Sequence, residues 1–327
     1  MKAVVLQGVG GPEVMDIAEV AAPRPGPNQV RVRVLATSVN RADIIQRQGH
    51  YPPPPGESDI LGLEVAGRID TLGTGVSEWK VGDRVMGLVA GGGYAEYALA
   101  YAGHLMPIPE SMDFTTAAGV SETYITAFLN VFLIGGFRAG QAVLLHGGGG
   151  GVNTAALQLC RALVLDATIV VTASAGKIER VKAMGADLVI DYKAQDFAAE
   201  VRMFTKNRGV DLILDHIGAQ YLKSNLKSLA AGGRLVIIGV IGGAEAQVNL
   251  AHLLVKRQQI IGSVIRSRSV EDKAAITAAF SEKVLPLLAG RRIAPLIHRI
   301  YPIDSVREAH REMENSRHFG KIVLAVQ

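Results

Sequence analysis

Five consecutive glycines, residues 147–151, interrupt the middle of this 327-residue chain and constrain its fold more than any other feature. An apolar run at 142–146 precedes them, and apolar residues recur at helical spacing from 152 to 163. Strand, glycine turn and helix together are typical of a dinucleotide site, because glycines let the backbone approach a pyrophosphate and the helix N-terminus attracts the anion. We therefore predict a dinucleotide site here rather than a flexible glycine loop.

Strand and helix patterns alternate from residue 122 to residue 292, which indicates an α/β domain with a doubly wound parallel (Rossmann) sheet. The apolar run at 142–146 is its first strand. The further predicted strands are 168–172, 188–192, 210–215, 234–239 and 259–264. The predicted helices are 152–163, 177–184, 197–205, 221–229 and 270–288.

Residues 1–121 instead predict a β-rich domain. In the stretch 30–35 valines alternate with arginines, as in a half-buried strand. Turns rich in glycine and proline separate this stretch from further predicted strands at 2–6, 63–70, 83–88 and 94–99, which favours a partly closed barrel. Residues 321–326 again have strand character. We therefore expect 293–327 to rejoin this domain, with the cofactor in the cleft between the two domains.

The charge and the cysteine content exclude several classes of function. Thirty-four basic and thirty acidic residues give a net charge of +4 without a basic run, so we expect no nucleic-acid partner. No apolar run reaches the roughly 20 residues of a membrane span, and the N-terminus runs into a predicted strand without a leader. Cys160 is the only cysteine, so no internal disulfide can form. We expect a cytoplasmic protein without a membrane partner.

The end of the second predicted strand of the α/β domain bears on the choice of cofactor. NAD-specific folds have an acidic residue there, which binds the ribose 2′-hydroxyl. This chain has Ser174 and Lys177 instead, and the nearest acids, Asp166 and Glu179, lie before the strand and beyond it. We therefore predict NADPH, with Ser174 and Lys177 on its 2′-phosphate. The alternative is a solvated lysine in a first helical turn. Tyr192, at the end of the third strand, is a further candidate for the phosphate or the adenine.

Short motifs along nearly the whole chain resemble the medium-chain dehydrogenase/reductase superfamily. They are GGPEV at 10–14, NRAD at 40–43, QRQGHY at 46–51, LGLEVAG at 61–67, VGDRV at 81–85, GGGYAEY at 91–97, TAF at 126–128, RSR at 266–268 and GKIVL at 320–324. Within the superfamily the chain resembles the zinc-free quinone oxidoreductases related to zeta-crystallin, especially their tumour-suppressor-inducible branch. The resemblance implies a GroES-like β-rich domain and, with the edge strand at 259–264, a homodimer.

The resemblance also bears on metal chemistry. The zinc branch has Gly-His-Glu where this chain has Gly62, Leu63 and Glu64, and leucine cannot ligate zinc. A single cysteine also cannot supply the cysteines of the zinc sites. We predict no metal and a direct hydride transfer from the nicotinamide to a quinone. The alternatives are an NADPH-dependent enone or 2-enoyl reductase, and a cofactor-bound protein without turnover.

The resemblance implies that three residues line the nicotinamide and substrate end of the site: Tyr51, Asn40 and Asp43. Tyr51 would donate a hydrogen bond or a proton to the developing oxyanion. The alternative for Tyr51 is a loop tyrosine packed on the prolines at 52–55. The alternative for Asn40 and Asp43 is an Asx-type turn cap.

The predicted cofactor contacts combine the residues argued above with Thr126, Val264, Ile265 and Arg317, which resemble cofactor contacts of the family. They are Thr126, Gly150, Gly151, Val152, Ser174, Lys177, Tyr192, Gly239, Val264, Ile265 and Arg317. For Thr126 the alternative is a helix hydroxyl bonded to its own backbone. For Val264, Ile265 and Arg317 the alternative is core packing or a solvated charge.

Two positions depart from the family pattern. Asn153 stands where a third glycine normally lets the helix pack close to the strand, which leaves the cofactor affinity open. The stretch 163–167 lacks the glycine that usually ends this helix. We expect the helix either to run longer or to end without a left-handed glycine cap.

Overall fold

The computed structural model describes residues 1–326, which divide into two structural units. Unit 2 is Thr126–Val264, and unit 1 combines Met1–Ile125 with the chain from Ile265 onward. The sequence-based boundaries at 121 and 292 differ from this division in the segment 265–292. That segment belongs to unit 1, because helix α9 (Val270–Ala289) packs against the turn Ala102–His104 of unit 1.

Unit 2 contains a six-stranded parallel sheet, which confirms the predicted doubly wound fold. Its strands are β8 (Ala142–His146), β9 (Thr168–Ala173), β10 (Leu188–Asp191), β11 (Val210–Asp215), β12 (Leu229–Ile237) and β13 (Gln259–Gly262). The order is β10-β9-β8-β11-β12-β13, and every neighbouring pair is parallel. The strand order reverses at β8, so the glycine turn that follows β8 lies at the switch point where such sheets bind ligands.

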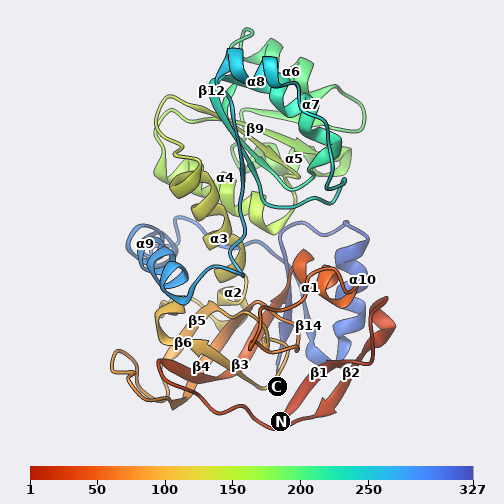
Figure 1. Cartoon of the computed structure of the whole chain (residues 1–327). Helices are drawn as coiled ribbons and strands as arrows, with labels where there is room; N and C mark the ends of the chain where they lie inside the picture. The colour runs from red at the N-terminus through yellow and green to blue at the C-terminus, as the bar shows by residue number, and fades with distance from the viewer. Residues whose placement is uncertain (327) are drawn as a thin grey trace. The chain divides into compact units, whose positions relative to one another are not determined.

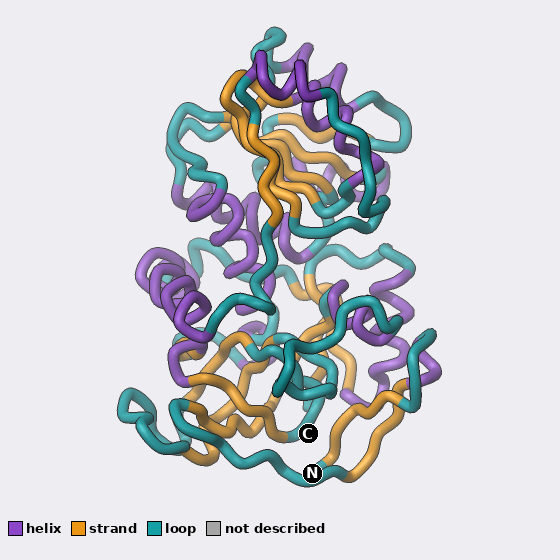
Figure 2. The backbone as a smooth tube through the Cα atoms, viewed as in Figure 1, coloured by secondary structure: helices purple, strands orange, loops and turns teal. Residues whose placement is uncertain are grey.

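The helices of unit 2 bury its central strands. They are α4 (Gly151–Leu163), α5 (Ile178–Ala183), α6 (Phe197–Phe204), α7 (Ala219–Ser228) and α8 (Leu250–Lys256). In Figure 1, α6, α7 and α8 lie together on one side of the strands, and Figure 2 shows these strands side by side. Every residue of β8 is buried, as expected for a parallel strand covered on both faces. Leu144 and Val170 share this core with Ile213 and Val201.

Helix α4 ends without a left-handed glycine cap, the second of the two predicted alternatives. Its last residue is Leu163, and Asp166 takes the left-handed conformation with φ 53°. Aspartate tolerates this conformation better than most residues. The Arg161 guanidinium secures the turn, because it donates to the Ala167 carbonyl at 2.7 Å and pairs with Asp187 at 2.7 Å. An arginine and an aspartate thus replace the missing glycine.

Unit 1 is built on a seven-stranded, mostly antiparallel sheet. Its strands are β3 (Gln29–Val39), β4 (Glu64–Leu72), β5 (Arg84–Leu88), β6 (Tyr97–Tyr101), β7 (Leu105–Pro107), β14 (Ile297–Pro302) and β15 (Lys321–Ala325), beside a separate pair β1 (Lys2–Leu6) and β2 (Met15–Glu19). β15 pairs with both β14 and β3, so the C-terminal strand joins the N-terminal sheet as predicted. Alternate residues of β3 are buried through its first half, in agreement with the valine pattern.

Helices of different lengths complete unit 1. They are α1 (Arg41–Arg47), α2 (Phe114–Ala117), α9 and α10 (Val306–Glu314), and helix α3 (Ser121–Phe128) begins in unit 1 and ends in unit 2. None of the helices within residues 1–326 is both long and apolar enough to cross a membrane.

Candidate active site

The glycine turn after β8 is closely packed within unit 2. A Cβ atom on Gly148 would lie 2.5 Å from Cγ1 of Val171, so only glycine fits there. Gly147 has φ 78°, a conformation that glycine adopts without strain. Gly150 is the N-cap of α4, and no described side chain caps the amides of its first turn. These backbone N–H groups at a helix N-terminus fit the pyrophosphate of a dinucleotide.

Lys177 and its neighbours lie beside this turn. A Cβ atom on Gly149 would lie 2.5 Å from Cδ and 3.1 Å from Nζ of Lys177, so the lysine side chain extends over the turn. Ser174 follows directly after β9. The Tyr192 N–H donates to the Ala173 carbonyl at 3.3 Å, which brings the ends of β9 and β10 together. The structure thus gathers Ser174, Lys177 and Tyr192 at the carboxyl edge of the sheet.

The other predicted cofactor residues lie in different environments. The hydroxyl of Thr126 is buried without a hydrogen-bond partner among the described residues, so it does not bond to its own backbone. Gly239 follows β12, and Val264 is half-exposed at the end of unit 2. Ile265 and Arg317 belong to unit 1, where Ile265 is buried and Arg317 is exposed. Gly151 and Val152 begin α4.

Asn153 is accommodated inside α4. Its side chain is 3% exposed, and its Nδ2 lies 3.7 Å from where a Cβ atom on Gly147 would be. Its Oδ1 is buried without a partner among residues 1–326. Helix α4 still packs against β8. The asparagine therefore fills space beside the turn.

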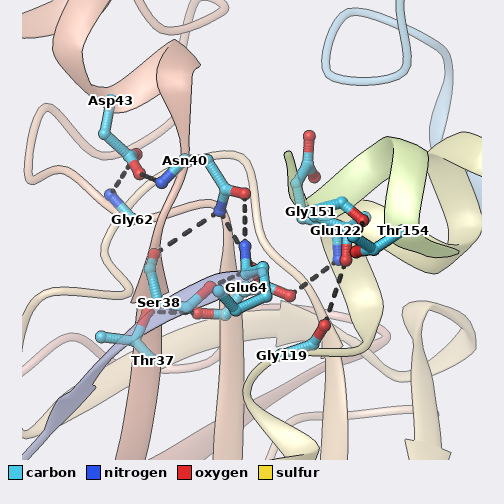
Figure 3. Close-up of polar contacts among 12 residues, drawn as sticks. Thr37, Ser38, Asn40, Asp43, Gly62, Glu64, Gly119, Glu122, Gly151 and Thr154 are labelled. Carbon is cyan, nitrogen blue, oxygen red and sulfur yellow. Dashed lines mark hydrogen bonds and ion pairs between the residues drawn. The ribbon is translucent and has the colours of Figure 1, made fainter. Parts of the chain in front are cut away.

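A buried ion pair joins the first residues of strands β4 and β15 in unit 1. Lys321 Nζ is 2.9 Å from Glu64 Oε1, and the two side chains are 3% and 0% exposed. Lys321 also donates to Asn40 Oδ1 at 2.6 Å, and Asn40 Nδ2 donates to Glu64 Oε1 at 2.9 Å. Ser38 donates to the same carboxylate oxygen, as Figure 3 shows. Asn40 is thus held between a buried cation and a buried anion.

Asp43 closes the N-terminus of helix α1. Its carboxylate accepts hydrogen bonds from the backbone N–H of Asn40 at 2.7 Å and of Gly62 at 3.2 Å, and from the Tyr94 hydroxyl at 3.1 Å. Asn40 and Asp43 form a capping box, and Asp43 is fully buried. Burial raises the pKa of Asp43 to about 6. This geometry agrees with the turn-cap alternative for Asp43.

A chain of donors runs from the surface to Asp43, and the sequence analysis missed it. Arg47 pairs with Glu314 at 2.5 Å and lies 3.0 Å from Nδ1 of His310. Arginine can only donate, so Nδ1 accepts and the hydrogen of His310 is on Nε2. That Nε2 lies 3.2 Å from the Tyr94 hydroxyl, which donates to Asp43. Burial and the Arg47 charge lower the pKa of His310 to about 3, so it stays neutral.

Tyr51 is held by an arginine that the sequence analysis did not select. The Arg266 guanidinium carbon lies 5.1 Å from the centre of the Tyr51 ring, a cation–π distance. Arg266 also donates to the Tyr51 carbonyl at 3.2 Å, to Gln46 Oε1 at 2.8 Å and to the Ala90 carbonyl at 2.8 Å. Burial raises the pKa of Tyr51. The only sequence signal for Arg266 was its place in the RSR motif.

Two neighbouring cavities open in unit 1 beside these residues. The smaller holds about 10 Å3, room for about one water, and is lined by Leu63, Leu88, Val89, Ala90, His104, Glu122, Ile265, Arg266 and Lys273. The larger holds about 250 Å3 and shares Leu88, Val89, Ala90, His104 and Lys273 with it. Neither cavity is lined by Tyr51 or Asn40. Only the smaller cavity is lined by Glu122 and by Arg266, the arginine that contacts Tyr51.

His146, directly before the glycines, is part of the core of unit 2. Its Nδ1 lies 3.0 Å from the Thr172 hydroxyl, and its Nε2 lies 2.7 Å from Asn225 Oδ1. Asn225 in turn donates to Asp215 at 3.1 Å. This chain ties the ends of β8, β9 and β11 together. His146 is fully buried, and burial lowers its pKa to about 3.

Replacement of His146 by glutamine is expected to remove part of the acid sensitivity of unit 2. The unfolded chain takes up a proton below its ordinary pKa of about 6.5, whereas folded His146 does so only near 3, so stability falls as the pH drops from 6.5. Between pH 6.5 and 5 this amounts to about 2 kcal/mol. Urea denaturation followed by circular dichroism measures it. The exposed His50, replaced by glutamine, is the control; an unchanged pH slope in the His146 variant would contradict the assignment.

Two family models match the chain. The one described as "Alcohol dehydrogenase GroES-like domain" matches residues 26–110, within unit 1. The one described as "Zinc-binding dehydrogenase" matches residues 151–282, which begin at helix α4. The first match lies within the predicted β-rich domain, and the second lies within the predicted dinucleotide domain.

Whole-length relatives agree with these matches. The quinone oxidoreductase of Rattus norvegicus is 33% identical, covering 99% of this chain and 97% of its own length. A solved structure described as an NAD-dependent alcohol dehydrogenase is 32% identical, with a TM-score of 0.87 over 100% of both chains. A mycobacterial structure complexed with NADPH is 27% identical, with a TM-score of 0.90 over 99% of this chain and 100% of its own.

Three findings lead to one assignment: the doubly wound unit with its glycine turn, the GroES-like unit and the whole-length similarity. The chain belongs to the medium-chain dehydrogenase/reductase family, whose members are oxidoreductases that bind nicotinamide cofactors.

Proposed function

We propose that this protein is an NADPH-dependent quinone oxidoreductase that works without a metal. The observation that carries the proposal is Leu63, a buried apolar side chain beside Glu64, at the position where the zinc branch has a histidine. No group of three or more His, Cys, Asp and Glu side chains within residues 1–326 is placed to hold a metal ion. Similarity to a quinone oxidoreductase over nearly the whole chain supports the same reaction.

The groups of unit 2 favour NADPH over NADH. The glycine turn and the N-terminus of α4 would hold the pyrophosphate, and Lys177 with Ser174 would bind the 2′-phosphate, where no carboxylate repels it. Thr126 offers its buried hydroxyl to the nicotinamide amide. When bound, this cofactor supplies the hydride. Solved neighbours include both an NADPH complex and an NAD-dependent enzyme, so the preference depends on these residues.

The groups of unit 1 would bind and orient the acceptor. Tyr51 presents a phenol, and Arg266 fixes its ring and adds positive charge that favours an oxyanion. Asn40 and Asp43 act as positioning residues, because they cap α1, and the loop that carries Tyr51 follows that helix. Leu63, Leu88 and other apolar residues line the smaller cavity and would limit the water that reaches an acceptor beside it.

Replacement of Tyr51 by phenylalanine is expected to lower kcat and kcat/KM together by about 1–2 kcal/mol, or roughly five- to thirtyfold. The phenol would act mainly in the transition state, so the affinity for NADPH should not change. Single-turnover rates in stopped flow, with one quinone in excess, measure the effect. Tyr51→Ala should in addition raise KM, because it removes the ring.

The matched control is Tyr97, whose ring lies 5.2 Å from the guanidinium carbon of Arg31; unlike Arg266, Arg31 does not line the smaller cavity. Tyr97→Phe should keep the wild-type rate. If Tyr51→Phe is equally silent while Tyr51→Ala raises KM, the ring only packs against the substrate, and its role as a donor is wrong.

Oxidation of NADPH with panels of quinones and enones tests the function itself. Fast turnover with quinones supports the proposal. Preference for enones identifies the rival, an NADPH-dependent enone or 2-enoyl reductase, which shares fold and cofactor. Tight NADPH binding without oxidation by any acceptor identifies the other rival, a cofactor-bound protein without turnover.

We also propose a cytoplasmic homodimer. The single thiol, Cys160, is buried and unpaired, which suits a reducing compartment. Strand β13 is the last strand of its sheet, and the adjacent α8 exposes Leu250, Leu254 and Val255, each more than 70%. A second copy pairing edge to edge would cover these side chains. Sedimentation of wild type and of Leu254→Glu tests the dimer.

A further inference from the structure

Glu122 is a carboxylic acid in the smaller cavity that the mechanism above does not use. It is the second residue of α3, and its backbone N–H donates to Glu64 Oε2 at 2.8 Å. In Figure 3 the carboxyl group of Glu122 points away from this contact. Among the described residues the Glu122 carboxyl makes no hydrogen bond and no ion pair, yet it lines the cavity with Arg266 and Leu63.

The cationic side chains near Glu122 make their hydrogen bonds and ion pairs with other groups. Lys321 is bound to Glu64 and Asn40, and Arg266 donates to three oxygens of the Tyr51 and Ala90 segments. Lys273 donates to the Arg266 carbonyl at 3.2 Å. The charged or titratable groups that face Glu122 from the surrounding elements are Glu64, Asp43, Lys321, Arg266, Tyr51, Lys273 and His104. None of them neutralises the Glu122 carboxyl by direct contact.

Glu122 therefore keeps its proton at neutral pH. Loss of hydration in the cavity and then the negative charge of Glu64 raise the pKa of Glu122 to about 8. A general acid works best when its pKa is near the working pH. Tyr51 is a weaker acid, because burial raises its pKa from 10, and Asp43 is fully buried and accepts three hydrogen bonds. Of these three groups, only Glu122 combines a position in the cavity with a transferable proton.

We propose that the Glu122 carboxyl donates the proton that completes reduction of the acceptor, a proposal that rests on the function proposed above. An acceptor that has received hydride carries a negative charge on its oxygen. The O–H bond of Glu122 breaks, and a new bond forms between that proton and the acceptor oxygen. One hydride and one proton together convert a quinone to a hydroquinone. Water then reprotonates the Glu122 carboxylate, with Tyr51 and Arg266 orienting the acceptor throughout.

The kinetic test compares Glu122→Gln with wild type, using NADPH and 1,4-benzoquinone. Glutamine keeps the size of the side chain but has no acidic proton, so kcat should fall roughly tenfold to a hundredfold. The wild-type rate should decline above about pH 8 as Glu122 ionises, and this decline should be absent in the variant. Glu122→Asp keeps an acid and should retain a pH-dependent decline.

The control is Glu57→Gln. Glu57 lines the larger cavity and does not line the smaller one. This variant should keep both the wild-type kcat and its decline at high pH. Wild-type kcat in Glu122→Gln, or the same decline above pH 8 in that variant, would overturn the proposal.

Infrared titration of the protein without cofactor provides a readout that does not depend on turnover. Wild type should show a protonated-carboxyl band at pH 7 that disappears through about pH 8 and is missing in Glu122→Gln. Absence of this band at pH 7 would also overturn the proposal, whatever the kinetics. If wild type reduces no quinone or enone although the band is present, the proposed function is wrong, while the protonated state assigned to Glu122 is correct.

Discussion

Replacement of Lys321 by methionine is expected to lower the free energy of unfolding of unit 1 by about 3–5 kcal/mol. The carboxylate of Glu64 is 0% exposed, and Lys321 is the cation that neutralises it at 2.9 Å. Methionine keeps most of the volume of lysine but leaves a buried charge without a partner, which is far more costly than the loss of packing. Asn40 would also lose a donor to its Oδ1.

Fluorescence in urea measures this loss within the correct unit. Trp79 is the only tryptophan, and its indole N–H donates to the Ala102 carbonyl in unit 1. The control is Arg31→Met, which removes the pair with Asp70, whose two side chains are 24% and 28% exposed, and should cost no more than about 1 kcal/mol. A loss of less than about 1 kcal/mol in Lys321→Met would contradict the assigned ion pair between Lys321 and Glu64.

A second substitution separates the charge from the packing. The double variant Lys321→Met/Glu64→Gln removes both charges, so it should recover most of the lost stability, because an uncharged buried amide is much cheaper than an unpaired carboxylate. The double variant should recover a smaller fraction of the wild-type activity than of the wild-type stability. Glu64 also accepts from Ser38, Asn40 and the Glu122 backbone, and a glutamine cannot accept all of these hydrogen bonds equally well.

The fold could be predicted from the sequence because its signals are local. Apolar runs such as 142–146 are short and stop at glycines, and their length and flanks together favour a buried parallel strand over a helix. Local signals failed where two elements meet. Residues 221–229 were predicted as one helix, but Leu229 already begins β12, because its register is set by the neighbouring strand β11. Likewise β6 begins at Tyr97, since pairing with β3 decides its start.

The candidate site likewise has one part that local sequence signals predict and another part that they do not. The glycine turn, Ser174 and Lys177 lie within about 30 residues of one another, so a βαβ motif indicates them together. Lys321 and Glu64 are 257 residues apart, and Arg47 and His310 are 263 apart. No spacing rule connects such pairs, because strand β15 and helix α10 bring them together only in the folded unit. For that reason the sequence indicated the cofactor side better than the acceptor side.

Replacement of Lys177 by alanine is expected to raise the Kd for NADPH roughly tenfold or more and to leave the Kd for NADH nearly unchanged. The lysine Nζ lies over the glycine turn, 3.1 Å from where a Cβ atom on Gly149 would be, so it approaches the turn that would hold the cofactor phosphates. A charge-assisted contact with the 2′-phosphate contributes about 1.5–3 kcal/mol, and NADH lacks that phosphate. Fluorescence titration of the purified protein with each cofactor measures both constants.

The control is Lys182→Ala, on the same helix as the residues that follow Lys177. Lys182 is half-exposed and pairs with Glu179 at 2.9 Å, so its loss changes the charge of the helix without removing a group from the turn. It should change both constants equally and by less than about twofold, because exposed charges at this distance are screened by salt. Equal weakening of NADPH and NADH in Lys177→Ala would assign the lysine to the pyrophosphate, which both cofactors share. A wild-type protein that prefers NADH would contradict the prediction that Ser174 and Lys177 bind a 2′-phosphate.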